Sequence, residues 1–586
     1  MPKQYEILFL PDNVRVKANE GASVYDVARV CDVMPNAFCG GNGTCGKCMV
    51  DITSGGRTVT KKACRTYVDA DMTVRIHDSG KASILTAGMG RQVDVAPAIR
   101  SFSVQVAKPV IGDERSEWEL FCESAGLDGS AQPPLPLVSR LCALREAEKP
   151  FFVTLLGNRL ISLDSEERSW LLAAFDIGTT TIVCYLLDEK TGEQKAVSSM
   201  LNPQTAFGAD VIARSRSAME HGGNDLQKAV VKALNQLLEQ ACRSIGVTTD
   251  SVALVTIVGN TCMHHLLLNL SPASLVHAPY NPAIRQAISV PAKELGVAIF
   301  ENGWVQLLPN IAGFVGADTV GCLVATDFPS LDGTTLIIDI GTNGEMVLGS
   351  KQRRIACSTA AGPAFEGAMI QCGMRGATGA IDHVHLENDR IVYSVIGGGK
   401  PAGICGSGLV DLIACLLEAG VLSSSGRIEE DGAYSEQITQ WDGKAAFLLA
   451  SAEDSLNGEP ILLTQKDVRE LQLAKAAMAA GIRLMSEALG ISVDSISRIL
   501  IAGAFGNYLD AHSACSIGLL PPELESRIRG IGNAAGEGAK ICALNAAEYE
   551  SSKQLAAKTE FLELATRADF QDCFVEELAF PGKDDE

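Results

Sequence analysis

IDIGTNG, residues 338–344, is the strongest indication of architecture because FDIGTTT at residues 175–181 is its counterpart earlier in the chain. Each stretch joins one apolar, strand-like run to another. A second pair follows in the same order, with ALVTIVGN ending at Asn260 and RILIAGAFGN ending at Asn507. Two pairs in one order predict a duplicated unit, and the apolar runs that alternate with helical segments predict α/β architecture.

The two D-x-G-T turns have the chemistry of a phosphate site. Such a turn offers backbone N–H groups and threonine hydroxyls to phosphate, and its aspartate suits hydrated Mg²⁺, which prefers oxygen ligands. One turn alone is as consistent with an ordinary hairpin, whereas two facing turns would hold a triphosphate from both sides. The small residues of 503–506 leave room for adenine or ribose, although close packing of a strand on a helix would also require them. We therefore predict a nucleotide site.

These motifs resemble those of the acetate and sugar kinase, Hsp70 and actin superfamily, over about residues 170 to 550. The resemblance implies an actin-like (ribonuclease-H-like) ATPase domain that binds ATP and Mg²⁺, with three catalytic residues: Asp176, Asp339 and Glu345. The residues expected to bind the nucleotide are Gly178, Thr179, Thr180, Gly341, Thr342, Asn343, Gly344, Gly503, Ala504, Phe505 and Lys475. Asp318, in FVGAD, is an alternative to Glu345 for orienting water, while either acid could be a solvated cap. Lys475 could equally face solvent from an amphipathic helix.

Four cysteines near the N-terminus form a second candidate site. They lie in CGGNGTCGKC and KKACRT with the spacing C-x5-C-x2-C-x15-C, as Cys39, Cys45, Cys48 and Cys64. The glycines between them let backbone pass tightly around a cluster and aim N–H groups at its sulfides. Structural zinc usually takes two C-x2-C pairs, so zinc or free thiols are the weaker alternatives. The loop resembles a plant-type [2Fe–2S] ferredoxin with one extra residue in the first gap.

Composition excludes several functional classes. The 586 residues are 47% hydrophobic and 20% charged, which is typical of a folded globular protein. The net charge of −21 disfavours nucleic acid and anionic membrane surfaces as partners. The longest apolar run, residues 252–270, is interrupted by polar residues, so no membrane span is expected. Single cysteines inside apolar stretches, together with a start that lacks signal-peptide organisation, predict a cytoplasmic protein.

The chain is predicted to have several domains, of mixed α/β and α+β class. Residues 1–80 carry short alternating strands and are expected to form a β-grasp, ferredoxin-like domain. Residues 81–100 are rich in small residues and are expected to form a linker. Residues 101–168 are expected to form a small mixed domain without obvious chemistry. The actin-like domain would occupy residues 169–586.

A one-electron centre and an ATP site on one chain suggest uphill electron transfer. For a one-electron couple 59 mV is a factor of ten, so a deficit of roughly 200 mV corresponds to about 4.6 kcal/mol. The whole chain closely resembles the ATP-dependent reductive activators of corrinoid proteins, through motifs that include NPQTAFGADVIAR, VGNTCMHHLLL, DIGTNGE and AGAFGNYLD. The resemblance implies electron transfer from the cluster to a Co(II) corrinoid on another protein, which regenerates the Co(I) nucleophile of a methyltransferase system. It also implies a low-potential electron donor and a homodimer formed through the actin-like domain.

Two other functions remain open. Activators of 2-hydroxyacyl-CoA dehydratases share the actin-like domain and hold a cluster between subunits, for which Cys357 and Cys405 are candidates, but they lack a ferredoxin domain. An ATP-binding redox sensor without an acceptor is the third hypothesis. His264 and His265 suggest a metal or corrinoid ligand, yet without a third ligand nearby we expect one satisfied core histidine beside an exposed one.

Overall fold

The structure is a computed structural model. It describes residues 3–10, 13–31, 33, 49–76, 91–128, 134–147, 149–208, 210–341, 343–367, 369–506 and 508–582.

The first domain is a five-stranded sheet of order β2-β1-β5-β3-β4 with one helix. Its elements are β1 (Gln4–Leu10), β2 (Val14–Asn19), α1 (Val24–Val30), β3 (Met49–Ser54), β4 (Arg57–Lys62) and β5 (Met72–Ile76). β1 and β5 are parallel, whereas the other neighbours are antiparallel. Ile7 and Phe9 alternate with more accessible residues and pack on Val24 and Ala28 of α1. This is the predicted β-grasp arrangement.

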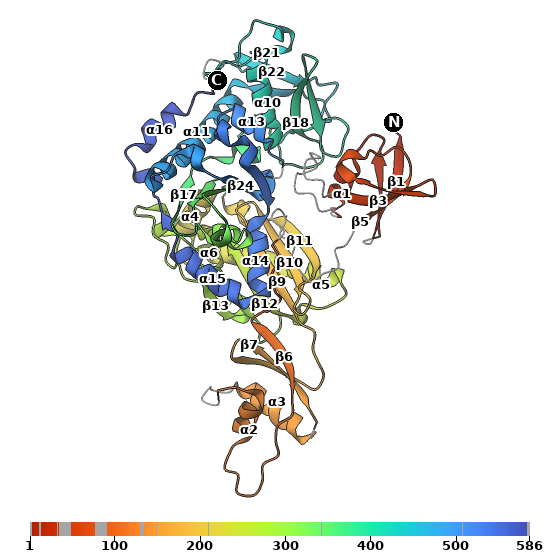
Figure 1. Cartoon of the computed structure of the whole chain (residues 1–586), viewed down its shortest axis with the longest axis vertical. Coiled ribbons are helices and arrows are strands. Elements are labelled where there is room, and N and C mark those ends of the chain that lie inside the picture. The colour runs from red at the N-terminus through yellow and green to blue at the C-terminus, as the bar shows by residue number, and fades with distance from the viewer. Residues whose placement is uncertain are drawn as a thin grey trace.

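A small second domain comes next in the chain. It is an antiparallel sheet of order β6-β7-β8 packed on two helices, and Figure 1 shows it at one end of the molecule. Its elements are β6 (Ile99–Val104), α2 (Glu117–Ala125), α3 (Leu135–Glu146), β7 (Phe151–Leu156) and β8 (Arg159–Asp164). Phe121 of α2 stacks on Phe151 with ring centroids 6.3 Å apart. The predicted bounds 101–168 contain these elements except for the start of β6, which lies inside the predicted linker.

The described half of the predicted linker, residues 91–100, contacts the large domain. Arg91 donates to the carbonyl of Val324 at 2.6 Å and pairs with Glu548. Val93 is buried in the core of the large domain, and Ala96 forms a β-bridge with Asn545. The low hydrophobic periodicity of residues 91–100 gave no sign of these contacts. They involve backbone groups and partners that are distant in sequence.

The large domain contains two six-stranded sheets with matching topology. The first has the order β11-β10-β9-β12-β14-β13 and the second the order β25-β24-β15-β16-β17-β26. In each sheet, three antiparallel strands are followed by two parallel ones, β12 and β14 or β24 and β25. The first sheet comprises β9 (Leu171–Ile177), β10 (Thr181–Asp188), β11 (Gln194–Leu201), β12 (Val252–Gly259), β13 (Ile288–Pro291) and β14 (Trp304–Leu307). The second comprises β15 (Thr335–Ile340), β16 (Gly344–Gly349), β17 (Arg354–Thr359), β24 (Arg498–Ala502), β25 (Ile528–Gly532) and β26 (Glu560–Phe561).

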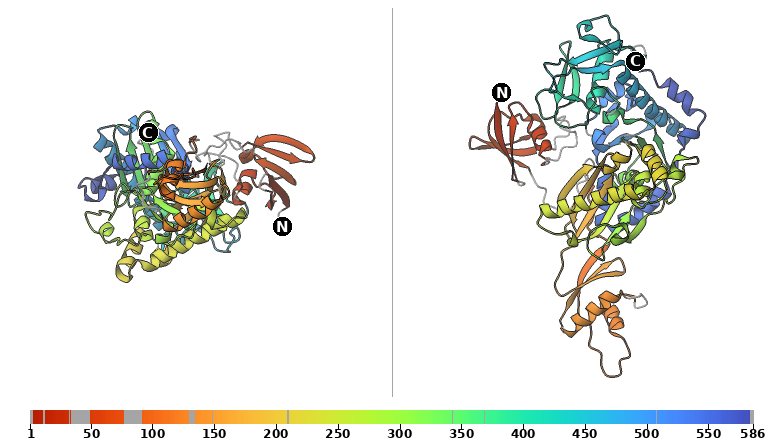
Figure 2. Two further views of the ribbon diagram at one scale, coloured as in Figure 1. Left: turned by 90° about the horizontal axis from the view of Figure 1, so that it is seen from below. Right: turned by 180° about the vertical axis from the view of Figure 1, so that it is seen from behind.

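Helices cover both sheets, so the domain is layered. α9 (Ala317–Ala325) and α14 (Ala534–Leu544) lie between the sheets, in one core with residues of both. α5 (Asn224–Ser244) covers the outer face of the first sheet, and α11 (Gln465–Leu489) covers that of the second (Figures 1 and 2). α9 and α14 cross at two glycines, where a Cβ on Gly538 would stand 2.1 Å from the carbonyl oxygen of Gly321. Any side chain there would force the two middle helices apart.

Two small sheets, β19-β18-β20 and β21-β22-β23, are inserted after β17 and form the opposite end of the molecule in Figure 1. Their elements are β18 (Ala380–Glu387), β19 (Arg390–Val395), β20 (Gly403–Ile404), α10 (Gly406–Glu418), β21 (Ile438–Trp441), β22 (Lys444–Ala450) and β23 (Ile461–Thr464). The remaining helices are α4 (Val211–His221), α6 (Thr261–Leu267), α7 (Ala273–Val276), α8 (Ala292–Leu295), α12 (Gly503–Gly506), α13 (Ala511–Ser516), α15 (Ala546–Ala557) and α16 (Phe570–Glu576).

Candidate nucleotide site

The two D-x-G-T turns occupy equivalent places in the two sheets. Residues 178–180 join β9 to β10, and residues 341–343 join β15 to β16. In the parallel ladders, Asp176 aligns with Val258 and Asp339 aligns with Ala502, so each turn lies beside the end of β12 or β24. Parallel strands end at one edge, and that edge is where open α/β sheets bind ligands. The duplication predicted from the sequence thus brings the turns to corresponding sheet edges.

Glycine closes the first turn tightly. The Gly178 amide donates to the Thr181 carbonyl at 2.9 Å, and a Cβ on Gly178 would lie 2.8 Å from that oxygen. In the second turn the Gly341 amide donates to the Asn343 carbonyl at 3.0 Å. Thr342 lies outside the described residues.

Four carboxylates in this region influence one another electrostatically: Asp176, Asp318, Asp339 and Glu345. Burial, together with the negative charge of Asp339, raises the pKa of Asp176 to about 7. Burial and the charge of Asp318 likewise raise the pKa of Asp339 to about 7. The pKa of Glu345 is raised well above its ordinary range, by burial and then by the charges of Asp318 and Asp339. Acids crowded in this way favour a bound cation that balances their charge.

Within the described ranges, no group of three or more Asp, Glu, His or Cys side chains is arranged to hold a metal ion on its own. Mg²⁺ usually keeps several waters and is held by one or two carboxylates beside substrate phosphates, a number that this site can supply. Asp176 also receives a hydrogen bond from the side chain of Asn533, which holds one carboxylate in place. The site therefore offers acidic oxygen donors beside the two turns.

The predicted adenosine motif lies beside the second turn. Gly503 has a φ of +86°, and a Cβ there would come within 3.0 Å of an Asp339 carboxylate oxygen, so the position requires glycine. Phe505 packs on Phe365 with ring centroids 5.1 Å apart, and a Cβ on Gly406 would meet both of these residues. The glycine-rich segments around residues 359–367 and 403–408 thus pack against the nucleotide motifs. The side chain of Ala504 lies outside the described part of the structure.

Two polar residues at the site were not predicted from the sequence. Glu366 accepts a hydrogen bond from the Thr180 hydroxyl at 3.1 Å, which links the first turn to a segment of the second half. Asn533 caps α14 through Gly536 N at 2.8 Å and donates to Tyr185 Oη at 3.2 Å. The sequence did contain a signal for Asn533. Asn533 directly follows Gly532 at the end of β25, just as Asn260 follows Gly259 at the end of β12.

Known proteins are similar to this chain over almost its whole length. It is 35% identical to the corrinoid activation enzyme RamQ of Eubacterium limosum, over 98% of this chain and 99% of the relative. The chain belongs to the family of corrinoid reductive activators. A solved structure of a reductive activator for corrinoid, iron–sulfur protein covers 99% of this chain and 98% of its own, with 32% identity and a TM-score of 0.76. A [Co(II) methylated amine-specific corrinoid protein] reductase of Methanosarcina barkeri is 26% identical, over 70% of this chain and 76% of its own.

The family models divide the large domain. Residues 171–330 match the RACo middle region, and residues 333–586 match the C-terminal domain of RACo, described as the ASKHA domain. The boundary falls just before β15, between the two copies of the duplicated unit. The family, the actin-like fold and the ATP-binding class of the C-terminal domain that the sequence predicted are thereby confirmed.

Lys475 lies away from solvent and has a partner outside the nucleotide motifs. Its ammonium donates to the carbonyl of Ala579 at 2.6 Å and lies 5.8 Å from the ring centroid of Phe580. Burial lowers the pKa of Lys475 to about 8. The solvent-facing alternative is therefore wrong, because the C-terminal segment covers this face of α11. A contact between Lys475 and the nucleotide stays a prediction.

The two adjacent histidines differ from the expectation of one buried and one exposed ring. His265 is satisfied, with Nδ1 2.7 Å from the Thr261 carbonyl and Nε2 accepting from Ala283 N at 2.9 Å. His264 is also buried, and within the described chain neither of its ring nitrogens has a hydrogen-bond partner. Burial lowers the pKa of His264 to about 3, so its ring is neutral. α6 is enclosed on all sides, which its helical periodicity did not indicate.

Of the four predicted cluster ligands, only Cys64 is described; Cys39, Cys45 and Cys48 lie outside the described residues. Cys64 is buried in a short 3₁₀ turn, Ala63–Arg65, in the core of the first domain. Cys357 and Cys405 are each buried among other neighbours, with Cys357 Sγ 3.2 Å from Met485 Sδ and Cys405 Sγ 3.3 Å from the Ile381 carbonyl.

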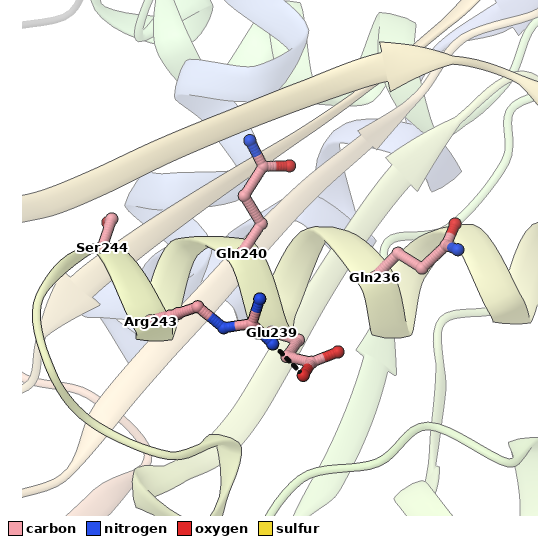
Figure 3. A pocket seen from close by; sticks show the side chains of 5 residues that line it. All are labelled: Gln236, Glu239, Gln240, Arg243 and Ser244. Atoms are coloured by element: carbon pink, nitrogen blue, oxygen red, sulfur yellow. Dashed lines mark hydrogen bonds and ion pairs between the residues drawn. The ribbon is translucent and has the colours of Figure 1, made fainter.

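Some open hollows of the surface lie away from the two turns. Figure 3 shows one on α5, lined by Gln236, Glu239, Gln240, Arg243 and Ser244, where Arg243 pairs with Glu239. A narrower pocket reaches the turns and is lined by residues that include Asn260, Thr261, Asn343 and Glu345. Across the described ranges, the structure contains no helix with the length and apolarity to span a membrane.

Proposed function

We propose that this protein uses ATP to drive single electrons onto the Co(II) corrinoid of a partner protein, which restores Co(I) for methyl transfer. The observation that carries the proposal is the electrostatic coupling of four carboxylates near two duplicated turns, in a chain related over nearly its full length to corrinoid activators. A kinase would need no ferredoxin-like domain, and a simple ferredoxin would need no nucleotide site.

In this proposal the nucleotide lies between the two turns. Asp176 and Asp339 would hold hydrated Mg²⁺, and the amides and hydroxyls of the turns would hold the phosphates. The segment 503–506 receives the adenosine, because Gly503 leaves space beside Asp339. Glu345 orients the attacking water, and Asp318 is the alternative for this role.

The electron route begins in the first domain. Cys39, Cys45, Cys48 and Cys64 would hold a [2Fe–2S] cluster, which supplies one electron at a time when it is reduced by a low-potential donor. The burial of Cys64 in a tight turn of the β-grasp core supports a ligand role, since the protein around it fixes its thiol. Each turnover reduces one Co(II) to Co(I) with one electron from the donor.

ATP couples to this transfer only if the nucleotide states differ in their affinity for the partner's states. We further propose a homodimer formed through the actin-like domain and a cytoplasmic location. The many cysteines that lie singly inside apolar stretches support a reducing compartment.

The test follows the cobalt spectrum anaerobically with a candidate corrinoid protein, a low-potential donor and ATP. The intact protein is expected to give Co(I), whereas Cys45→Ser and Asp339→Asn are each expected to give none. Equal Co(I) yields from all three proteins would refute the coupling. Activity toward a 2-hydroxyacyl-CoA dehydratase alone would select the alternative activator class.

A further inference from the structure

The first D-x-G-T turn, residues 178–180, is held on one side by two buried polar residues. Asn202 is fully buried, and its Nδ2 donates to the Gly178 carbonyl at 2.9 Å. Arg214 of α4 is also fully buried, and one Nη donates to the Thr179 carbonyl. The backbone amide of Asn202 donates to the Thr180 carbonyl at 2.9 Å. Three successive carbonyls of the turn thus each accept a hydrogen bond from Asn202 or Arg214.

Peptide geometry then fixes the direction of the turn's amides. Each peptide unit is planar and trans, so a carbonyl and the N–H of the next residue point in opposite directions. The carbonyls of Gly178 and Thr179 face Asn202 and Arg214, which directs the N–H groups of Thr179 and Thr180 away from these residues. Neither amide donates a hydrogen bond to any residue of the described chain. Two directed, unused donors on a turn form a concave site for an anion.

Arg214 has no carboxylate partner among the ion pairs of the described residues. Its Nε donates to the Gly208 carbonyl at 2.9 Å, and its other Nη lies 3.3 Å from Met263 Sδ. Burial lowers the pKa of Arg214 to about 10, so the guanidinium still carries its charge at neutral pH. Asp210 lies near enough to interact electrostatically, but its carboxylate caps α4 through Ala213 N at 2.8 Å. A buried guanidinium behind the turn therefore adds positive potential where phosphate would bind.

A second motif joins this arrangement. Met263 of α6 contacts both residues, with its sulfur 3.6 Å from Asn202 Nδ2 and 3.3 Å from an Arg214 Nη. Asn260, at the start of α6, donates to the Thr179 hydroxyl at 2.9 Å. The NPQTAFGADVIAR and VGNTCMHHLLL stretches therefore converge on one turn.

We propose that Asn202 and Arg214 are positioning residues that preset the 178–180 turn for the phosphates of the nucleotide. The inference rests on the proposed function, because it assumes that the turn binds ATP. It predicts that the two side chains act on phosphate binding and leave adenosine binding unchanged.

The experiment compares Arg214→Met, Arg214→Lys and Asn202→Asp with the intact protein, by calorimetric titration with ATP, ADP and adenosine. Asn202→Asp keeps the acceptor for Gln204 N, loses the Nδ2 donor to Gly178 and to Gln204 Oε1, and adds a negative charge behind the turn. Arg216→Met is the matched control, since Arg216 is exposed on the same helix. Loss of a charged hydrogen bond predicts that Arg214→Met weakens ATP and ADP binding about tenfold, with adenosine affinity unchanged. Arg214→Lys is expected to restore part of the loss.

The kinetics give a readout that a merely structural residue would not move. The KM for ATP is expected to rise by the same factor, with kcat much less affected. A folded Arg214→Met with the ATP affinity of Arg216→Met, or with equal losses for ATP and adenosine, would overturn the inference. An intact protein that binds no ATP would instead overturn the proposed function.

A measurement on the intact protein removes the dependence on variant folding. Hydrogen exchange is followed with ATP and with adenosine, and ATP is expected to protect residues 175–181 and 202–214 together. Protection of the first segment alone would mean that the turn binds phosphate without the residues behind it, against the inference. Adenosine is expected to protect neither segment.

Discussion

Asp339 of β15 lies directly opposite Glu345 of β16 in the antiparallel ladder. Residues opposite one another in such a pair have side chains on the same face, and like charges there are destabilising. In the first copy of the unit, the residue opposite Asp176 is Val183. The two copies are therefore equivalent in backbone and unequal in chemistry, and the extra acid belongs to the second copy alone. An unfavourable pair in this place is most simply explained by function.

We expect Glu345→Gln to lower kcat for ATP hydrolysis about 100-fold or more while KM stays nearly constant, because general-base groups contribute about that factor. Steady-state kinetics at saturating Mg²⁺ measure both constants. Asp318→Asn is the comparison: a larger kcat loss there, with Glu345→Gln close to the intact protein, would assign the water-orienting role to Asp318.

We expect Asp176→Asn and Asp339→Asn each to abolish magnesium-dependent ATP hydrolysis and to leave the visible iron–sulfur spectrum unchanged. Removing one of several crowded negative charges also relieves repulsion, so the nucleotide-free variants are expected to melt a few degrees higher than the intact protein. Calorimetric melting without Mg²⁺ checks the second effect. If the aspartates were only turn caps, stability would instead fall by about 0.5 to 2 kcal/mol and activity would persist.

Iron and sulfide analysis is expected to give about two of each per chain, as a [2Fe–2S] cluster requires. Serine at Cys39, Cys45, Cys48 or Cys64 is expected to remove the cluster without unfolding the actin-like domain, which has its own core. Cys357→Ser is the matched control and should keep the spectrum, because that thiol is buried far inside another core. About four irons per chain, or a cluster lost in Cys357→Ser, would contradict the assignment.

The His383–Asp411 pair predicts a pH-dependent contribution to stability. His383 Nδ1 lies 3.0 Å from Asp411 Oδ2. Burial lowers the pKa of His383, but the hydrogen bond and charge of Asp411, with the charges of Asp382 and Asp510, outweigh burial and raise it above 6.5. The folded state then binds the proton more tightly than the unfolded state. Its stabilisation is complete below pH 6.5 and is lost as pH rises through the folded pKa.

His383→Gln is therefore expected to lower the free energy of unfolding by about 1 to 2 kcal/mol at pH 6 and by less at pH 8.5. Denaturant titration at the two pH values measures the difference. His512→Gln is the control, because His512 is 74% exposed in its pair with Glu525 and such pairs contribute little. An equal loss at both pH values in His383→Gln would show that the protonated pair adds no stability.

Local patterns predicted most of the framework. The alternating strands expected in residues 1–80 include β1, β2 and β5, and the helical segments expected between the apolar runs of the large domain include α5 and α11. These segments were predictable because apolar periodicity reports directly on the face that is buried. The duplicated turns were predictable because a repeated motif implies a repeated strand order.

Contacts between distant segments were not predictable. Glu366 accepts a hydrogen bond from Thr180 across 186 positions, and Lys475 donates to the carbonyl of Ala579 in the C-terminal segment. No periodicity in either partner records such a pairing, because it depends on how complete layers stack. His264 shows the same limit, since its burial comes from elements packed around α6 and not from the helix itself.

The crossing of α9 and α14 restricts how this architecture can be divided or recombined. α9 belongs to the first copy of the unit and α14 to the second, yet α14 packs on β9 and β12 of the first copy. A fragment ending near residue 330 would leave those apolar strands uncovered, so the two family regions are not independent modules. In a chimera that took each region from a different relative, Gly321 and Gly538, which contact one another, would come from different parents. Only parents that both keep a bare backbone at positions 321 and 538 could exchange them.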